Sequence, residues 1–396
     1  MPIKIITLDP AHFHAALIHK EMVPGIEPEV HVFAPLGPDL MAHLNRLMAF
    51  NSRPADPTRW DVEVHASADF LKHMLRQPPG NVAVLAGRNH TKIDSMLACA
   101  EAGLHILADK PWIIRHADMP KLERLLAVAK SKGVVIFDIM TERHEITSIL
   151  QRELVLDPEV FGELIPGTPE EPAIEMESIH ALKKLVAGTP LMRPPAFFDI
   201  QNDIQMISAE RWPTVLSRDD YEQITGEKNF PVALGDELDR DHFAYYCNNR
   251  AIYVILDHFV LLDIRWDVEL AAGDTHFAEY RGTRSAVRIS QDPDKVAPPD
   301  LDVIPNADGD RSAVRGALEQ RVSVLAARCA GLQVADHGQG FRIVIPADLR
   351  IGHEAHFAQV ASEFLTYVHA PGKMPAWEMP NLLAKYFVTT KAVEMG

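Results

Sequence analysis

The chain has 396 residues, more than one ordinary hydrophobic core accommodates, so its length indicates two domains. Hydrophobic residues make up 47% and charged residues 24%, as in soluble globular proteins, which excludes a largely disordered chain. The formal net charge of -16 argues against a nucleic-acid-binding surface, because phosphate contacts require a basic patch.

The cysteines and the hydropathy pattern indicate the compartment. Cys99, Cys247 and Cys329 are odd in number and far apart, which argues against a disulfide framework and favours a reducing environment. The first residues lack the basic stretch and apolar core of a secretory signal. No uncharged apolar run reaches the ~20 residues that span a bilayer. We therefore expect a cytoplasmic protein without a membrane partner.

The N-terminal third alternates between short apolar runs and segments with helical spacing. The apolar runs predict strands at residues 3–8, 30–34, 62–65, 82–86, 104–108 and 134–138. The segments between them predict helices at residues 13–20, 39–50, 68–76, 92–102 and 119–132. Strands that alternate with helices of this length predict a parallel sheet with helices on both faces, as in a Rossmann-like domain.

A change of pattern marks the domain boundary. A helix predicted at residues 146–154 leads out of the first domain, and a dense run of prolines and glycines follows from Pro158 to Pro172. We place a Rossmann-like dinucleotide-binding domain at residues 1–150. A domain for substrate binding and oligomerisation follows at residues 151–396.

The second domain has a different order of elements. Strands predicted at residues 252–256, 260–266 and 286–290 follow one another without helices, which favours an open, largely antiparallel sheet. Helices are predicted at residues 317–329 and 355–369, and the segment 293–310, rich in proline and aspartate, is predicted to be an exposed loop. The fold class is therefore α/β, with an N-terminal Rossmann-like parallel sheet and a C-terminal α+β domain.

Two neighbouring motifs carry a family resemblance. A buried strand leads into the loop at Asn89, a helix follows, and the next strand ends in Asp109-Lys110-Pro111. This arrangement resembles the Gfo/Idh/MocA family (glucose–fructose oxidoreductase and inositol dehydrogenase), in which a Pro-Asn-like loop precedes the helix and the later strand ends in Glu-Lys-Pro. Segments 273–282 and 351–359 resemble the putative-oxidoreductase subgroup of that family.

The resemblance implies an oxidoreductase that uses NAD or NADP. In that family the lysine reaches the nicotinamide and the substrate hydroxyl, so Lys110 is the expected catalytic residue. Asn89, Asp109 and Pro111 are the expected cofactor neighbours. An X-Pro bond adopts the cis form at little cost, which would aim Lys110 into the cleft at the carboxyl ends of the strands. The second strand ends in Phe33-Ala-Pro, so no acidic residue there selects NAD over NADP.

The turn after the first strand departs from the dinucleotide fingerprint. G-x-G-x-x-G lets the backbone approach the pyrophosphate, which the helix N-terminus then holds. Here Ala11 can replace the third glycine because it is small, and His12 could add a donor. The hydride-transfer hypothesis requires that this turn still binds a pyrophosphate. The residues expected to contact the cofactor are Leu8, Asp9, Ala11, His12, Phe13 and His14.

The motif that supplies the proton acceptor in the family is also missing from this sequence. Members usually carry Asp-x-x-x-His on a second-domain helix, and the segment 197–213 has none. We expect His180 to be the acid/base, since an unperturbed histidine titrates near pH ~6.5. Lys184 would share a face with it if residues 178–184 are helical, and Lys184 and His276 are expected substrate contacts. The resemblance of residues 137–143 to the segment that borders the family's active site adds Glu142 and Arg143. The alternative for each is a surface or packing role.

The histidine-rich segments suggest metal binding only weakly. His12-Phe-His14 and His353-Glu-Ala-His356 do not match the H-E-x-x-H zinc motif. His353 and His356 could share a helix face with a distant third ligand. A helix that begins at this segment is a better explanation than metal binding, because the negative charge of Glu354 would interact favourably with the helix dipole there. We therefore predict no metal site.

Three functions remain open. The first is oxidation of a hydroxyl of a sugar, polyol or glycoside, with hydride passing to NAD(P). The second is a catalytically silent relative that binds a sugar or a partner. The third is an NAD-assisted lyase or glycosidase. The expected partner is a small carbohydrate-like molecule, and the broad second-domain sheet is expected to form the interface of a homodimer or homotetramer.

Overall fold

The computed structural model describes residues 2–181, 185–186, 189–190, 204–230, 238–239, 241–269, 273–307 and 311–396. Contacts between residues divide the chain into two compact units. Unit 1 contains the chain up to Glu142 together with Gly352–Thr390, and unit 2 contains the described residues from Arg143 to Ile351 and Lys391–Gly396. The division of roles at residue 150 remains a prediction.

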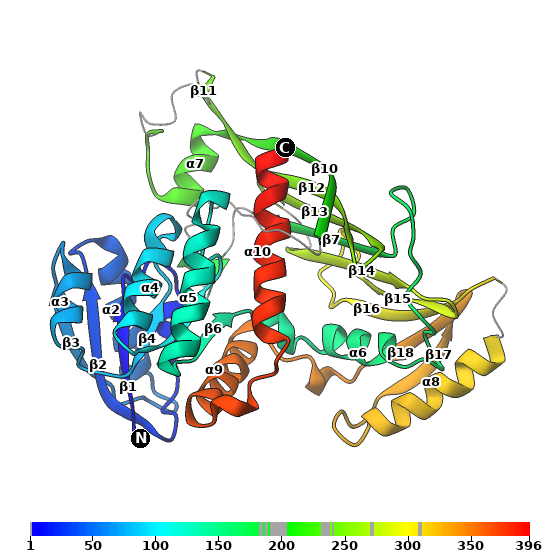
Figure 1. Cartoon of the computed structure of the whole chain (residues 1–396), viewed down its shortest axis with the longest axis horizontal. Helices are drawn as coiled ribbons and strands as arrows, with labels where there is room; N and C mark the ends of the chain where they lie inside the picture. Colours follow the sequence, from blue (N-terminus) through cyan, green and yellow to red (C-terminus); the bar gives the residue numbers. More distant parts are fainter. Residues whose placement is uncertain are drawn as a thin grey trace. The chain divides into compact units, whose positions relative to one another are not determined.

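Unit 1 is built on a six-stranded parallel sheet in the order β3-β2-β1-β4-β5-β6 (Figure 1). This is the strand order of doubly wound dinucleotide-binding folds, so the Rossmann-like prediction is confirmed. The central strands are buried on both faces, and all four residues of β4 are buried. The strands are β1 (Ile3–Leu8), β2 (Ile26–Ala34), β3 (Asp61–Ala66), β4 (Val82–Leu85), β5 (His105–Asp109) and β6 (Ile136–Ile139).

Helices follow the strands as predicted, with one difference. The helix predicted at residues 13–20 is reduced to the four residues of α1. By contrast, α5 has the predicted bounds and ends at Gly133, which adopts a left-handed φ of 67°. The helices that follow the strands are α1 (His14–Leu17), α2 (Pro38–Ser52), α3 (Phe70–Arg76), α4 (Lys92–Glu101) and α5 (Met119–Lys132), with short 3₁₀ turns η1 (Asn89–Thr91), η2 (His116–Asp118) and η3 (Thr141–His144).

Two C-terminal helices pack in unit 1. α9 (His353–His369), predicted at 355–369, contacts β6, where the ring of Phe137 packs against those of Phe364 and Tyr367. α10 (Glu378–Met395), which the sequence analysis missed, carries Tyr386, whose hydroxyl accepts a hydrogen bond from the Trp112 backbone N–H at 2.7 Å. The 3₁₀ turn η6 (Pro371–Lys373) joins these helices, and η5 (Ala347–Leu349) precedes α9.

Unit 2 contains a ten-stranded sheet, which confirms the open, largely antiparallel prediction. Only β13 and β7 pair in parallel along its described path. α6 and α8 cover one face at the β14–β18 end (Figure 1), where Phe341, Val303 and Leu318 are fully buried. The elements are α6 (Ile146–Val155), β7 (Ile174–Ala181), β10 (Ile204–Ser217), α7 (Arg218–Thr225), β12 (His242–Ile255), β13 (His258–Asp267), β14 (Thr275–Arg281), β15 (Ser285–Ser290), β16 (Asp300–Pro305), α8 (Arg311–Leu325), β17 (Gln333–His337) and β18 (Gly340–Val344), with short β11 (Leu238–Asp239) paired to β12, and β8 (Leu185–Val186) paired to β9 (Thr189–Pro190).

Two expectations for unit 2 do not hold. Residues 178–184 were considered as a possible helix, but Ile174–Ala181 form strand β7, because this segment pairs with β13 on one side and β14 on the other. The supposed loop at 293–310 contains β16, whose alternate residues Leu301 and Val303 are buried against the helices. In both places long-range pairing outweighs the local pattern. None of the described helices has the length and apolar character that a membrane span requires.

Candidate active site

Lys110 stands at the carboxyl end of β5, the strand next to the β6 edge of the parallel sheet. It follows β5 directly, so its neighbour Asp109 is buried while Lys110 itself is exposed. The Lys110–Pro111 peptide bond is cis, as expected. Trp112 anchors the next turn, since its indole N–H donates to the Ala108 carbonyl at 3.1 Å. The sheet thus presents one ammonium group at the edge where open parallel sheets bind ligands.

Asp109 joins two histidines from the turn after β1. Its Oδ2 lies 2.8 Å from Nδ1 of His12, and its Oδ1 lies 3.0 Å from Nδ1 of His14. Burial alone would raise the pKa of Asp109, but its charge interactions and hydrogen bonds with His14 and His12 outweigh that effect and hold the pKa well below its ordinary value. Burial also lowers the pKa of His12, against the attraction of Asp109. A carboxylate between two imidazoles is therefore the stable arrangement here.

A third histidine reaches this group from the other end of the chain. Nε2 of His353, the first residue of α9, lies 3.3 Å from Nε2 of His14, and the two rings stack with centroids 5.0 Å apart. An ion pair between Lys20 and Glu354 joins the same two segments. The two histidine-rich motifs of the sequence thus meet at His14, and no local pattern could indicate this because they are more than 300 positions apart.

The turn that stands in place of the glycine fingerprint packs tightly against the sheet. Asp9 adopts a left-handed φ of 45°, which makes the tight turn that a glycine would otherwise make. The His12 backbone N–H donates to the Ala86 carbonyl at 2.8 Å. A Cβ on Gly87 would lie 2.4 Å from the Asp9 carbonyl oxygen, so the turn packs directly on the end of β4. Of the predicted cofactor contacts, Leu8 has its side chain in the core.

The Asn89 side chain accepts a hydrogen bond from a buried lysine, Lys92, which the sequence analysis missed. Nζ of Lys92 donates to Asn89 Oδ1 and to the Asp109 carbonyl, both at 2.8 Å. Burial lowers the pKa of Lys92 to about 8, although Asp109 and other carboxylates favour its charge. A lysine in the first turn of a helix is unfavourable for the helix dipole, which was the available signal. Lys92 fixes the Asn89 loop to the end of β5.

Glu142 lies in η3 within unit 1, and Arg143 belongs to unit 2. Desolvation would raise the pKa of Glu142, but Lys110 is the main opposing influence, with His353 contributing, and the net effect lowers it. Glu142 therefore stays ionised near the Lys110 ammonium. This is a polar environment suited to a hydroxyl-bearing ligand.

The second-domain histidines lie on neighbouring strands of unit 2. His180 in β7 places Nδ1 3.3 Å from Asp274 Oδ2, and its ring packs on Trp266 with centroids 4.6 Å apart. His276 in β14 pairs in register with Ser178, whose hydroxyl lies 3.1 Å from its Nδ1. Because residues two apart in a strand share a face, the two predicted histidines occupy the same face of the sheet. Lys184 lies outside the described residues.

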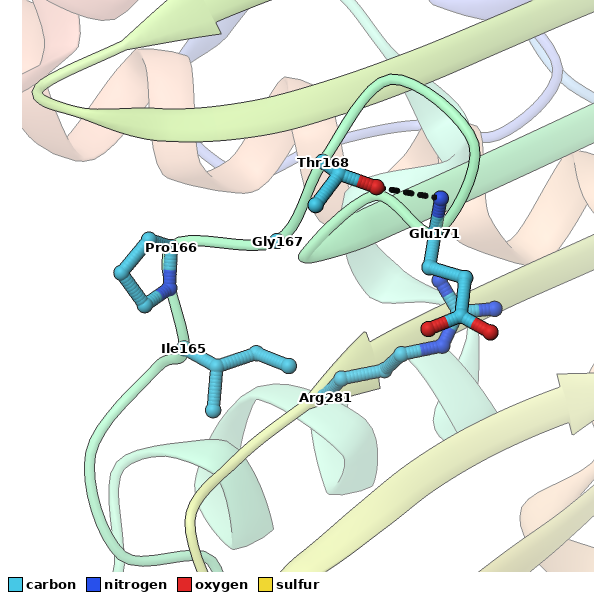
Figure 2. A pocket seen from close by; sticks show the side chains of 6 residues that line it. All are labelled: Ile165, Pro166, Gly167, Thr168, Glu171 and Arg281. Atoms are coloured by element: carbon cyan, nitrogen blue, oxygen red, sulfur yellow. Dashed lines mark hydrogen bonds between the residues drawn. The ribbon is translucent and has the colours of Figure 1, made fainter.

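Figure 2 shows a separate pocket in unit 2, lined by Ile165, Pro166, Gly167, Thr168, Glu171 and Arg281. Thr168 Oγ1 accepts from the Glu171 backbone N–H at 3.0 Å and closes the turn over it. The guanidinium of Arg281 already pairs with Glu175 and Glu279. The pocket contains none of the residues predicted to act in the site.

Comparisons with known proteins identify the family. A family model described as "Putative oxidoreductase C terminal domain" matches residues 150–203 and 199–396. The solved structure of a "putative oxidoreductase" from Parabacteroides merdae is 38% identical, with a TM-score of 0.93 over 99% of this chain and 97% of that chain. KijD10, a 3-ketoreductase from Actinomadura kijaniata solved with TDP-benzene and NADP, has a TM-score of 0.58 at 15% identity over 100% of this chain and 98% of that chain.

A third solved structure, an oxidoreductase by description from Erwinia carotovora atroseptica, has the same TM-score of 0.58 at 12% identity, over 100% of this chain and 98% of that one. The two distant structures show the fold alone. No curated protein matches the chain. The extent of the family match and the 38% identity over almost the whole chain establish that this protein belongs to the oxidoreductase family of the Gfo/Idh/MocA fold.

Proposed function

We propose that the protein is an NAD(P)-dependent oxidoreductase that acts on a hydroxyl of a sugar, polyol or glycoside. The observation that carries the proposal is the exposed Lys110 at the carboxyl end of β5, between buried Asp109 and cis Pro111. This lysine lies in Asp109-Lys110-Pro111, the segment that resembles the family's Glu-Lys-Pro. KijD10, which shares the fold, was solved with NADP and a TDP-linked ligand.

The residues at this edge of the sheet fit a nicotinamide dinucleotide. The backbone N–H groups of Phe13 and His14 donate to no acceptor among the described residues, so a phosphate can take them. Asp9 makes the tight turn, and small, buried Ala15 and Ala16 let the segment pack on the sheet. When bound, the dinucleotide supplies the hydride acceptor or donor.

The chain's own groups then orient the substrate and hold its charge. The Lys110 ammonium would bind the reacting oxygen and stabilise the negative charge that develops on it, an effect that is large when the donor is fixed in advance. His180, oriented by Asp274, is our proposed acid/base. Glu142, Arg143, Lys184 and His276 are the proposed substrate contacts.

The first test is cofactor binding. Purified protein is titrated with NADH and with NADPH while nicotinamide fluorescence is recorded, and we expect saturable binding of at least one. A panel of sugars, polyols and glycosides is then tested by absorbance of the reduced nicotinamide. The ratio of the two affinities decides between NAD and NADP.

Lys110→Met tests the proposed role of the ammonium. We expect kcat to fall by roughly 10²–10³-fold with little change in dinucleotide affinity, because the lysine acts on charge that develops during reaction. Lys130→Met, an exposed lysine of α5, is the matched control and should retain activity. An unchanged kcat in Lys110→Met would remove Lys110 from the mechanism.

One observation favours a catalytically silent relative instead. α1 has only four residues, and the rings of His12 and His14 extend from the turn to Asp109. Flat fluorescence traces with both dinucleotides would support this alternative and reject the hydride-transfer proposal.

A further inference from the structure

Three potential metal ligands converge at the end of β5. His12 and His14 each offer Nδ1, Asp109 offers its carboxylate, and these atoms all lie within 4.8 Å of one another. His14 and Asp109 are buried and His12 is largely so, which protects the group from bulk water. Two imidazoles and one carboxylate form the donor set of many divalent-metal sites that keep open coordination positions.

The ligand atoms of the group face one another. Nδ1 of His12 is buried and lies 2.8 Å from Asp109 Oδ2, and Nδ1 of His14 lies 3.0 Å from Asp109 Oδ1. Imidazole nitrogens and a carboxylate that converge in this way can coordinate one cation.

The distances fit a small cation after slight movement. Tetrahedral ligands held at about 2.1 Å from Zn²⁺ are separated by roughly 3.4 Å. The two histidine–aspartate separations, 2.8 Å and 3.0 Å to different oxygens of Asp109, are about half an ångström shorter than this, and all ligand atoms lie within 4.8 Å of one another. His353 lies 3.3 Å from the other ring nitrogen of His14 and can fix that ring, as the outer partners of metal-bound imidazoles do.

We propose that His12, His14 and Asp109 bind one divalent transition-metal ion of the Zn²⁺ class. The site lies next to Lys110, so a bound cation and the ammonium would together attract an oxygen-bearing ligand. Its existence does not depend on hydride transfer, because the argument uses only the ligand atoms and their surroundings. The prediction of no metal from the sequence is thereby revised.

A second histidine–carboxylate group provides a matched comparison. His31, Glu63 and His65, on the adjacent strands β2 and β3, also bring ligand atoms within 4.8 Å of one another. There Nδ1 of His31 and Nε2 of His65 lie 3.2 Å apart in hydrogen-bonding geometry, and Glu63 is exposed. The variant His65→Gln removes this group and leaves the proposed site intact.

The experiment measures Zn²⁺ binding by isothermal titration calorimetry after chelator dialysis of the full-length protein. We expect His65→Gln to bind one Zn²⁺ per chain at the proposed site. Adding His12→Gln or Asp109→Asn to this background should weaken that binding by at least ~10-fold, and adding His353→Gln by roughly 10-fold. Far-UV circular dichroism and urea unfolding confirm that each variant is folded. Co²⁺, whose visible spectrum depends on its nitrogen and oxygen ligands, provides a second readout.

Two results would overturn the proposal. One is the absence of Zn²⁺ binding in His65→Gln, and the other is binding that His12→Gln and Asp109→Asn leave unchanged. NADH and NADPH titrations of the metal-free and Zn²⁺-loaded protein keep this result separate from the hydride-transfer proposal. Dinucleotide binding without metal binding rejects the metal site alone, and metal binding without dinucleotide binding rejects only the proposed cofactor.

Discussion

Lys92 shows how one buried charge can organise a site. Its ammonium bridges the Asn89 side chain and the Asp109 carbonyl, so it connects the loop after β4 to the strand end that carries Lys110. The sequence shows a lysine in the first turn of a helix, which is unfavourable for the helix dipole, but it does not show what surrounds that lysine. Only the packing of α4 against the sheet removes water from it and lowers its pKa to about 8.

The lowered pKa of Lys92 predicts a stability change at alkaline pH. In the unfolded chain this lysine titrates near its ordinary 10.5, so between about 8 and 10.5 the unfolded state binds more protons than the folded state. The free energy of unfolding of the wild type should therefore rise with pH across this window, relative to Lys92→Met. Urea unfolding at several pH values measures the difference, with exposed Lys132→Met as control. Parallel curves for wild type and Lys92→Met would contradict the prediction.

The lowered pKa of His43 predicts a loss of stability at acid pH. Burial, with a smaller contribution from Arg46, lowers its pKa from 6.5 to about 3, and it lies beside His19, which is similarly perturbed. As pH falls from 6.5 toward 3, the unfolded chain takes up a proton that the folded chain cannot, so the free energy of unfolding falls. His43→Leu should reduce this slope by up to ~1.4 kcal/mol per pH unit.

Urea unfolding of His43→Leu across the acid range provides the measurement. His90→Gln removes an exposed histidine from the same unit and should leave the slope unchanged. An identical slope in wild type and His43→Leu would show that His43 is protonated in the folded protein.

At the scale of elements, α10 stabilises unit 1 through polar contacts as well as packing. Tyr386 is fully buried, and its hydroxyl accepts from the Trp112 N–H one residue beyond Pro111. Lys385 forms an ion pair with buried Asp138 at β6. The helix thus supports the backbone that follows Lys110. The sequence analysis missed α10 because its burial depends on elements far away in the chain.

Tyr386→Phe tests this support. It leaves the buried Trp112 N–H without its acceptor, so we expect a loss of about 1–3 kcal/mol in the free energy of unfolding. Tyr367→Phe is the matched control, because its hydroxyl bonds to the side chain of Glu363 within the same helix, and it should cost less than ~1 kcal/mol. Urea unfolding measures both, and equal losses would argue against a special role for the Trp112 contact.

At the scale of the whole molecule, the sheet of unit 2 has one face covered by α6 and α8. Its other face carries ion pairs and apolar residues. Asp263 and Glu279 are almost fully buried there by their arginine partners, Arg250 and Arg288 among them. Leu261 lies on the same face as Asp263, two positions along β13, and is only half-buried. A broad sheet face of this kind is typical of an interface between protein chains.

We therefore predict self-association through this face, as a homodimer or homotetramer. Leu261→Glu should shift the protein toward the monomer, because it would place a charge without a partner in the interface. Val296→Glu, in an exposed loop, is the control. Sedimentation velocity measures the mass of each. A wild-type monomer at all concentrations would reject the prediction, and an oligomer that persists in Leu261→Glu would place the interface elsewhere.

The sequence by itself determined the alternation of strands and helices in unit 1 and the Asp109-Lys110-Pro111 strand end. Both can be recognised from neighbouring residues, since short-range hydrophobic periodicity indicates buried strands and amphipathic helices. Tertiary structure alone decided that residues 174–181 form a strand, because pairing with β13 and β14 supplies their hydrogen bonds. It also decided that His353 joins His14 and Asp109, because only the packing of α9 in unit 1 brings together residues that no local pattern connects.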